Sequence, residues 1–560
     1  MTRIDADTIG PVSKPSPNAD GRGLDEPTPP GGSTPAQTHP NFRKHLRNLV
    51  ANWTSQGANI VVMFFLSPFV VGMLGKEVNG VWSLLNVLIG YMAVLDLGVR
   101  ASTGRYVILY IGRNDHPLVD QTIRTGMGFF TAGGLLLVAT TLGISIGFPG
   151  LFKSVNPQYR DVVRILLPVL AINVWLTTVG AVLSSVLVAY DQFHIARSVD
   201  IVGLAVRTVG TVLALVWGYG LIGLTAVLVI SNLAVAAGLY AFAHRTYPRL
   251  RLWPPMLSRP RLGELMRYGI GACIIATTVK LGSQTDLVVV GAAINVPTVT
   301  IYSVGAMVVW YSGTFIQSIE TIFFPSLQRA AARNEIGTVG DLFLNISRSG
   351  LSLGLPLYLG FIIFGKAFLS LWMGGKLSPS DIGGAYTVMA ILSCAKLVSL
   401  FDIVGSGTIT ALGHIRFTTM VCVAEALLNL GLSLVFVLVL DWGIAGVALG
   451  TVIANIISRS LVNPFYACRR LSLSPLLFVK RVVVPAVLAV ACIAAWYKAS
   501  SLLATDTWWH FARTVALAAA GAGVISCLVL LPEGPRRRIA GKLAGPYVWV
   551  RNKAGKSGSG

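Results

Sequence analysis

A lysine and an aspartate interrupt one of the apolar stretches of this sequence. Lys280 and Asp286 stand in the segment "ATTVKLGSQTDLVVVG", which belongs to a run long enough to cross a bilayer. A charged side chain at the centre of a membrane span costs about 2.5–3.5 kcal/mol on insertion scales. Residues of this kind therefore face the interior of a helix bundle or a water-filled cavity. We interpret Lys280 and Asp286 as candidate parts of a transport site.

Two further cations fall near the midpoints of apolar runs. Arg207 and Lys396 lie as deep in their segments as Lys280 does. Guanidinium and ammonium groups at mid-membrane are suited to phosphate, and arginine can contact two phosphate oxygens at once. The three residues are predicted to line a central cavity and to bind an anionic substrate there.

The buried acidic residues are predicted to act as charge partners. Glu425 lies near mid-span and Glu320 nearer an end, so each is a candidate partner for a buried cation or a candidate ion-coupling group. Asp286 is expected to pair with a neighbour or to join helices, and ion coupling is the alternative. Arg459 is expected to snorkel or to form an interhelical pair.

Neutral polar residues form stripes at helical spacing on two predicted helices. Such stripes either join helices by hydrogen bonds or line a polar passage. Because the two helices lead the two halves of the chain, a cavity between the halves is the preferred interpretation. The stripe residues predicted to line it are Asn52, Gln56 and Asn59 in the first helix, and Thr277 and Gln284 beside Lys280 in the other.

No residue pattern predicts enzyme chemistry. The six cysteines show no CxxC spacing, the seven histidines form no HExxH motif, and Walker A and GxSxG sequences are absent. We therefore predict no catalytic residue, no metal site and no cofactor. A membrane-embedded glycosyltransferase is disfavoured as well, because no loop between apolar runs exceeds about 25 residues.

The composition is that of a membrane protein with many spans. Hydrophobic residues make up 54% of the chain and charged residues 12%, whereas soluble domains carry about 25% charged residues. The net charge of +21 comes largely from short loops and the C-terminal tail. This distribution follows the positive-inside rule rather than the footprint of nucleic-acid binding. No nucleic-acid partner is expected.

The apolar runs predict an all-α protein with about fourteen transmembrane helices. Two six-helix lobes are expected, related by a pseudo-two-fold axis along the membrane normal, with two further helices at the C-terminal end. Alternate loops are rich in arginine and lysine, which places both termini in the cytoplasm. The predicted parts are a disordered tail (1–41), an N-lobe with spans one to six (42–243), a basic cytoplasmic connector (244–265), a C-lobe with spans seven to twelve (266–468), spans thirteen and fourteen (469–532) and a basic cytoplasmic tail (533–560).

An internal repeat supports the two lobes. "YGLIGLTAVLVISN" ends at Asn232, and the similar "WGIAGVALGTVIAN" ends at Asn455, 223 residues later. Nearer the start of each half, "GMLGKEVNGVWSL" (72–84) has a looser counterpart in "GAAINVPTVTIYSV" (291–304). Several matches in register, at offsets of about 219 to 223 residues, indicate duplicated halves that enter the membrane from the same side.

Three stretches resemble the polysaccharide-transporter branch of the multidrug/oligosaccharidyl-lipid/polysaccharide exporter superfamily. They are "LSPFVVGMLGKEVNGVWSLLNVLIGYMAVLDLGVRASTGRYV", "SQTDLVVVGAAINVPTVTIYSV" and "DWGIAGVALGTVIAN". The resemblance implies a flippase that moves undecaprenyl-pyrophosphate-linked oligosaccharides across the bacterial inner membrane by alternating access, for surface or exopolysaccharide biosynthesis. The implied partners are the lipid-linked oligosaccharide, membrane lipid, and the polysaccharide polymerase and chain-length machinery.

Two other transport functions remain open at this point. A multidrug/cation antiporter of the same superfamily should favour buried acidic residues, whereas the mid-span charges here lean basic. A peptidoglycan lipid-precursor flippase shares the expected fold, and the dependence of cell-wall synthesis on the protein would identify it.

Overall fold

The chain is helical throughout the part that the structure describes. The computed structural model describes residues 42–92, 98–151 and 156–531, apart from the side chains of some helical residues within them. The predicted tails, 1–41 and 533–560, lie outside the described residues. Within those ranges the one extended pairing is an isolated bridge between Gly374 and Leu377.

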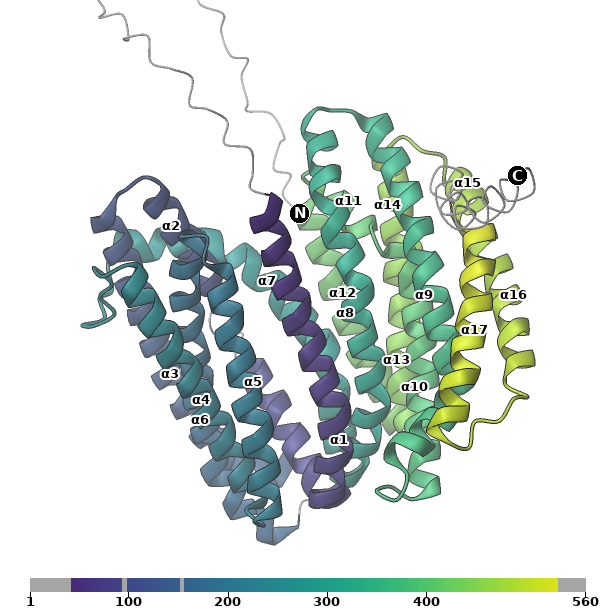
Figure 1. The fold of residues 1–560 in the computed structure, drawn as a ribbon, viewed down its shortest axis with the longest axis horizontal. Helices are drawn as coiled ribbons and strands as arrows, with labels where there is room; N and C mark the ends of the chain where they lie inside the picture. The colour runs from purple at the N-terminus through teal and green to yellow at the C-terminus, as the bar shows by residue number, and fades with distance from the viewer. Residues whose placement is uncertain (1–41, 93–97, 152–155, 532–560) are drawn as a thin grey trace, which may run out of the picture. The chain divides into compact units, whose positions relative to one another are not determined.

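The helices follow one another with short turns (Figure 1). In the first half they are α1 (Phe42–Met92), α2 (Val99–Gly112), α3 (His116–Leu151), α4 (Pro157–Ala189), α5 (Phe193–Val216) and α6 (Gly220–Thr246). In the second half they are α7 (Arg259–Val289), η2 (Val290–Ile294), α8 (Val296–Ala332), α9 (Ile336–Met373), α10 (Pro379–Ser399), η3 (Leu400–Asp402), α11 (Gly405–Ala411), α12 (Ile415–Leu438), α13 (Gly443–Asn455), η4 (Ile456–Val462) and α14 (Asn463–Arg470). The last helices are α15 (Pro475–Phe478), η5 (Val479–Val483), α16 (Val484–Ser500) and α17 (Trp508–Val529).

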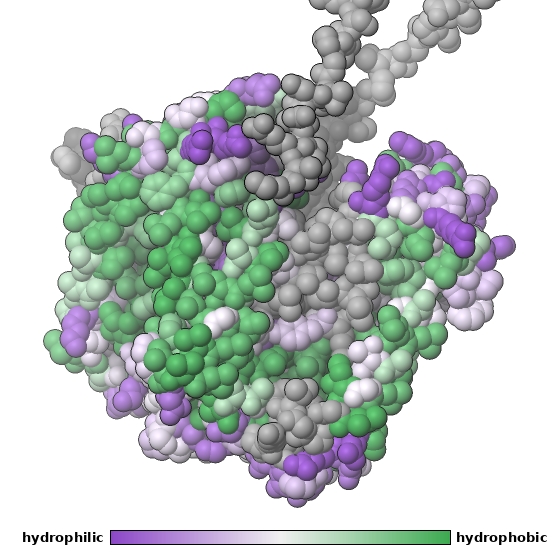
Figure 2. Space-filling model, turned by 180° about the vertical axis from the view of Figure 1, so that it is seen from behind, coloured by the Kyte–Doolittle hydropathy of each residue, from purple (hydrophilic) through white to green (hydrophobic). Residues whose placement is uncertain are grey.

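Twelve of the described helical segments are long and apolar enough to cross a membrane. One of them, Gly57–Tyr91, contains a break at Gly75, whose φ of 73° and ψ of 170° are not helical. The helix α7 is described in part and is not among the twelve. The membrane-spanning, all-α class is confirmed, and the number fourteen stays a prediction. Figure 2 shows the apolar side chains covering the middle of one face, with hydrophilic residues toward its two ends.

Side-chain caps fix where several helices begin. Asn156 Oδ1 accepts from Gln158 N at 3.3 Å before α4, and Asn295 Oδ1 accepts from Thr298 N at 2.9 Å before α8. Ser378 and Asp381 form a capping box before α10. Each cap satisfies an amide that the helix itself leaves without an acceptor. All three helices start at the end of the molecule where Gly75 breaks α1, which we call the Gly75 end.

The two halves pack their helices in corresponding pairs. In the first half α4 packs on α3 and on α6, and α5 packs on α6. In the second half α10 packs on α9 and on α13, and α12 packs on α13. Asn232 Nδ2 donates to Asn173 Oδ1 at 2.7 Å, and its repeat counterpart Asn455 donates to the carbonyl oxygen of Ala395 at 3.5 Å. The predicted repeat is thus present in the packing as well as in the sequence.

The halves meet at the Gly75 end through a reciprocal contact. Thr300 Oγ1 donates to the carbonyl oxygen of Lys76 at 2.6 Å. Gly80 lies directly against the backbone of Val296, where an added Cβ would collide. At an offset of 220 residues, Gly80 corresponds to Thr300 and Lys76 to Val296. The counterparts of Thr300 and Lys76 therefore meet each other as well, which is the pattern expected at a two-fold axis.

Replacement of Gly80 tests this contact. Gly80→Val is expected to destabilise the protein by about 1–3 kcal/mol, because a side chain must displace the Val296 backbone. The measurement is the fraction of purified protein that stays folded and monodisperse after heating in detergent. Gly133→Val, at a helical site with open space around its Cβ, is the matched control. Equal heat resistance of the two variants would contradict the close approach.

Candidate functional site

A column of buried polar side chains runs along α12 in the second half. Glu425, Asn429 and Ser433 recur every four residues, so they lie on one face of the helix. This face packs against α13 and η4. Polar residues at this spacing in an apolar helix need partners from neighbouring helices, since lipid offers none. Those partners form two clusters along the column.

The first cluster surrounds Asp286 of α7. Its carboxylate is 3% exposed and accepts three hydrogen bonds from three other helices. Tyr302 OH of α8 donates at 2.7 Å, Thr451 Oγ1 of α13 at 3.1 Å and Asn429 Nδ2 of α12 at 3.2 Å. Among the hydrogen-bond partners that the described residues offer this carboxylate, none is basic. Asp286 thus joins four helices, as expected for a helix-pairing residue.

The second cluster surrounds Glu425. Arg459 donates from both Nε and Nη2 to Glu425 Oε1, each at 3.0 Å. Ser458 Oγ donates to Oε2 at 2.6 Å. Both donors belong to η4, where a π-helical stretch interrupts the last helix of the second half. Such interruptions re-aim side chains, and they are frequent at functional sites.

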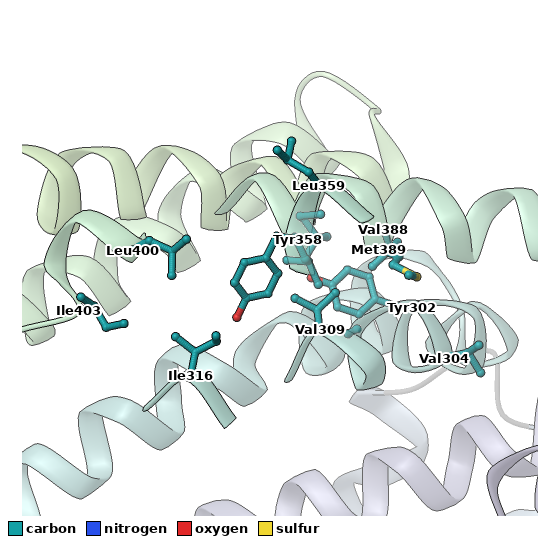
Figure 3. Close-up of a cluster of buried hydrophobic side chains, with 14 of the residues drawn as sticks. Tyr302, Val304, Val309, Ile316, Tyr358, Leu359, Val388, Met389, Leu400 and Ile403 are labelled. Carbon is teal, nitrogen blue, oxygen red and sulfur yellow. The ribbon is translucent and has the colours of Figure 1, made fainter. Parts of the chain in front are cut away.

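Lys396 of α10 lies beside the second cluster. Its ammonium group is close enough to Glu425 and Arg459 for both charges to act on it. Gly313 of α8 also lies close to Lys396. A Cβ added at Gly313 would be 3.8 Å from Lys396 Nζ and 3.9 Å from Tyr358 OH. The ring of Tyr358 lies in the apolar core between α8, α9 and α10 (Figure 3). The structure therefore brings together the predicted residues Lys396 and Glu425.

Arg207 of α5 faces a different part of the second half. It interacts electrostatically with Tyr311 of α8. Tyr311 and Gly313 are two residues apart, so their Cα–Cβ directions differ by about 200° around the helix axis. Arg207 and Lys396 hence approach α8 from different faces. Of the predicted cations, Arg207 is the one that the described structure places across the boundary between the halves.

The remaining predicted residues are described incompletely or not at all. Gln284 of α7 and Asn59 of α1 are half-buried. Both lie on the helices that lead the two halves. The side chains of the other five lie outside the described residues, and these are Asn52, Gln56, Thr277, Lys280 and Glu320.

Sequence reasoning missed several members of the column. Tyr302, Asn429 and Thr451 bind Asp286, yet no pattern in the sequence marked them. The available signal was a polar residue within each of three apolar runs of the second half, those of α8, α12 and α13. Position near the middle of a span marks a charged residue as unusual, whereas a neutral polar residue at the same position is common. The neutral partners of Asp286 therefore did not stand out in the sequence.

Comparison with known proteins finds similarity to proteins of polysaccharide biosynthesis and transport. Residues 154–382 match the family model described as "Polysaccharide biosynthesis protein". The chain is 22% identical over 179 residues to a Haloferax volcanii protein described as "Probable low-salt glycan biosynthesis flippase Agl15", an alignment that covers 32% of this chain and 36% of that one. The alignment thus spans little more than a third of that relative. A Shigella flexneri protein described as "Putative O-antigen transporter" is 21% identical over 415 residues, covering 71% of this chain and 92% of the relative.

Among solved structures, the chain is similar to the lipid II flippase MurJ in an inward closed conformation. The TM-score is 0.65 at 14% identity, and the match covers 86% of this chain and 98% of that one. At this identity the likeness concerns the fold. The relatives and this neighbour are described as transporters or flippases, and none is described as an enzyme.

Proposed function

We propose that this chain, a polysaccharide transporter of the multidrug/oligosaccharidyl-lipid/polysaccharide exporter superfamily, is a flippase for lipid-linked oligosaccharide repeat units. The observation that carries the proposal is its likeness to proteins described as a glycan flippase and an O-antigen transporter. The substrate proposed is an undecaprenyl-pyrophosphate-linked oligosaccharide, moved across the bacterial inner membrane for surface polysaccharide synthesis. The polymerase and chain-length machinery are the proposed downstream partners.

The basic mid-span residues suit the headgroup of such a substrate. A pyrophosphate is strongly anionic, and its transfer through an apolar layer requires compensating positive charge. We propose Arg207 and Lys280 as headgroup ligands between the halves, with Asn52, Gln56, Asn59, Thr277 and Gln284 as hydrogen-bonding groups along the same passage. Lys396 acts from the second half, where Glu425 and Arg459 set its electrostatic surroundings.

The proposed transport cycle is alternating access. At the Gly75 end, Lys76 Nζ pairs with Asp381 at 3.2 Å, and Trp372 Nε1 donates to the carbonyl oxygen of Phe64 at 2.7 Å. Together with the Thr300 contact, these bonds would have to break when the halves separate at that end. We expect these contacts to close the Gly75 end in the conformation in which the opposite end of the transporter is open to substrate.

Asp286 is proposed as the ion-coupling residue of this cycle. It is a buried carboxylate with hydrogen-bonding partners on three other helices. A change in its charge would change the acceptor capacity of all three bonds at once. Binding of a proton or another monovalent cation would thus be transmitted directly to the packing of the second half. Glu425, which is already paired with Arg459, is proposed as a structural charge partner.

Deletion and complementation test the proposed function. Deletion of the gene is expected to remove surface polysaccharide and to leave lipid-linked oligosaccharide on the inner leaflet, measured by accessibility of the saccharide in spheroplasts and inverted vesicles. Normal surface polysaccharide together with arrested cell-wall synthesis would instead identify a flippase for peptidoglycan precursors. Loss of drug resistance alone would identify an antiporter.

Two variants test the proposed ligands. Arg207→Ala and Lys280→Ala are each expected to lower complementation about tenfold or more, because a charge-assisted bond to phosphate contributes about 1.5–3 kcal/mol. Arg164→Ala, which removes an arginine from an exposed pair with Asp161, is the matched control. Protein levels are compared by immunoblot. Full activity of both variants at normal levels would remove these residues from the site.

A further inference from the structure

The segment that joins the two halves is held firmly on the first half. This connector loop, residues 247–258, lies between α6 and α7. Arg124 Nε of α3 donates to the carbonyl oxygen of Pro254 at 2.9 Å, and the amide of Met256 donates to the carbonyl oxygen of Arg124 at 3.1 Å. Tyr247 and Leu250 are 4% and 5% exposed in the core of the first half. The loop thus has a fixed conformation on α3.

The opposite face of the connector loop is left open, and it carries both apolar and basic groups. Trp253 is 73% exposed and Leu257 is 56% exposed, although both are large apolar side chains. Arg249 and Arg251 flank them and are exposed. From His244 to Arg267 the sequence contains six arginines and one glutamate, Glu264.

The carboxylates that the structure describes near this loop are already paired with other arginines. Glu264 is already paired with Arg261 at 2.6 Å, where it also accepts from Tyr110 OH at 2.9 Å. Asp120, the carboxylate beside the loop on α3, pairs with Arg124 at 3.5 Å. Within the described residues, no carboxylate forms an ion pair with Arg249, Arg251 or Arg259. The open face is therefore electrostatically complementary to an anionic partner from outside the described residues.

The position of the loop indicates where this partner lies. The connector loop follows α6, which is long and apolar enough to span the membrane, so it lies at the level where that span leaves the bilayer. On the last turns of α6, Tyr240 and Phe242 are also exposed, and Arg245 lies over the Phe242 ring at 6.0 Å. Aromatic residues interleaved with arginine are typical of the membrane–water interface.

We propose that the connector loop is an interfacial anchor that binds the headgroups of anionic phospholipids in the adjacent leaflet. Trp253 and Leu257 insert at headgroup depth, while Arg249 and Arg251, together with Arg259 at the start of α7, contact phosphate oxygens. The rigid attachment to α3 means that little ordering entropy is lost on binding. Each arginine at such a surface favours anionic lipid by about fivefold. The anchor holds the first half at a defined depth, whatever substrate the protein carries.

Lipid selectivity of the reconstituted full chain tests this proposal. Spin-labelled phosphatidylglycerol and phosphatidylcholine are compared for the fraction of lipid immobilised by the wild type and by Arg249→Gln/Arg251→Gln/Arg259→Gln. The wild type is expected to prefer phosphatidylglycerol at least fivefold, and the variant is expected to lose most of this preference. The matched control is Arg329→Gln/Arg333→Gln/Arg416→Gln, which removes three exposed arginines from other loops and is expected to retain it.

Tryptophan fluorescence gives an independent readout. The difference between the emission of the wild type and that of Trp253→Phe reports Trp253 alone, and brominated phosphatidylglycerol is expected to quench it more than brominated phosphatidylcholine does. An equal loss of selectivity in both arginine variants would assign the effect to total charge and overturn the proposal. Unquenched Trp253 emission in brominated vesicles would overturn it as well.

Discussion

Asp286→Leu is expected to yield little folded protein. The substitution leaves Tyr302 OH and Asn429 Nδ2 without their acceptor in an apolar bundle, whereas Thr451 Oγ1 can still donate to Asn429 Oδ1 at 3.2 Å. Each unsatisfied buried group costs about 1–3 kcal/mol, so the two together cost about 2–6 kcal/mol, a large part of the stability of an ordinary domain. The measurement is the yield of monodisperse protein from detergent extracts.

Asp286→Asn separates folding from coupling. The amide keeps one acceptor oxygen and the size of the side chain, so we expect folded protein at close to normal yield. Because it carries no titratable charge, transport driven by an ion gradient is expected to fall about tenfold or more, whereas exchange without a gradient persists. Tyr302→Phe, which removes one donor and leaves the carboxylate, is the control and should keep coupling. Gradient-driven transport by Asp286→Asn at the wild-type rate would exclude the ion-coupling role.

Breaking the Glu425–Arg459 pair on one side is expected to be far more harmful than removing both charges. In Arg459→Leu the Glu425 carboxylate stays in a helix bundle, with 17% of its side chain exposed, and it keeps Ser458 as its hydrogen-bond donor among the described residues. The loss of one partner from a buried pair costs about 3–5 kcal/mol. Since about a third of the Arg459 side chain is exposed, we expect the lower part of that range.

The double variant Glu425→Gln/Arg459→Leu is expected to recover most of this stability, because neither residue of the pair is left as a charge without its partner. A double-mutant cycle on heat resistance in detergent measures the coupling between the two residues. Arg164→Leu with Asp161→Asn, an exposed pair at 2.9 Å, is the matched control and should show coupling below about 1 kcal/mol. Additive effects at Glu425 and Arg459 would mean that the pair contributes nothing to folding.

The sequence predicted the class of fold because bilayer physics leaves few choices. Apolar runs of about 20 residues must be helices, and a duplicated order of such runs implies related halves. The offset between Asn232 and Asn455 gave the repeat, and the packing of α6 and α13 confirmed it. The number of spans was less certain, because some breaks are so short that two runs could be one long helix, as at 217–219 between α5 and α6 and at 439–442 between α12 and α13.

The site was harder to predict, because depth in a span says nothing about direction. Lys396 and Arg207 are equally deep in the sequence, yet they approach α8 from different faces. The neighbours of a helix face are known only once the packing of the helices is known. In addition, the π-helical segment η4 rotates the residues that follow it around the helix axis, and the spacing of apolar residues in the sequence does not show this rotation. Asp286 was recognised by its charge, whereas Asn429 became visible only through the bond between them.

The reciprocal contact at the Gly75 end also bears on how the two halves diverged. Position 80 is a glycine that admits a neighbouring backbone, and its counterpart Thr300 supplies a hydroxyl to the facing carbonyl. With one residue type at both positions, two glycines would lack the bond and two threonines would collide with the facing backbone. The contact therefore depends on a difference between the halves, and Thr300→Gly or Gly80→Thr is expected to weaken it from either side.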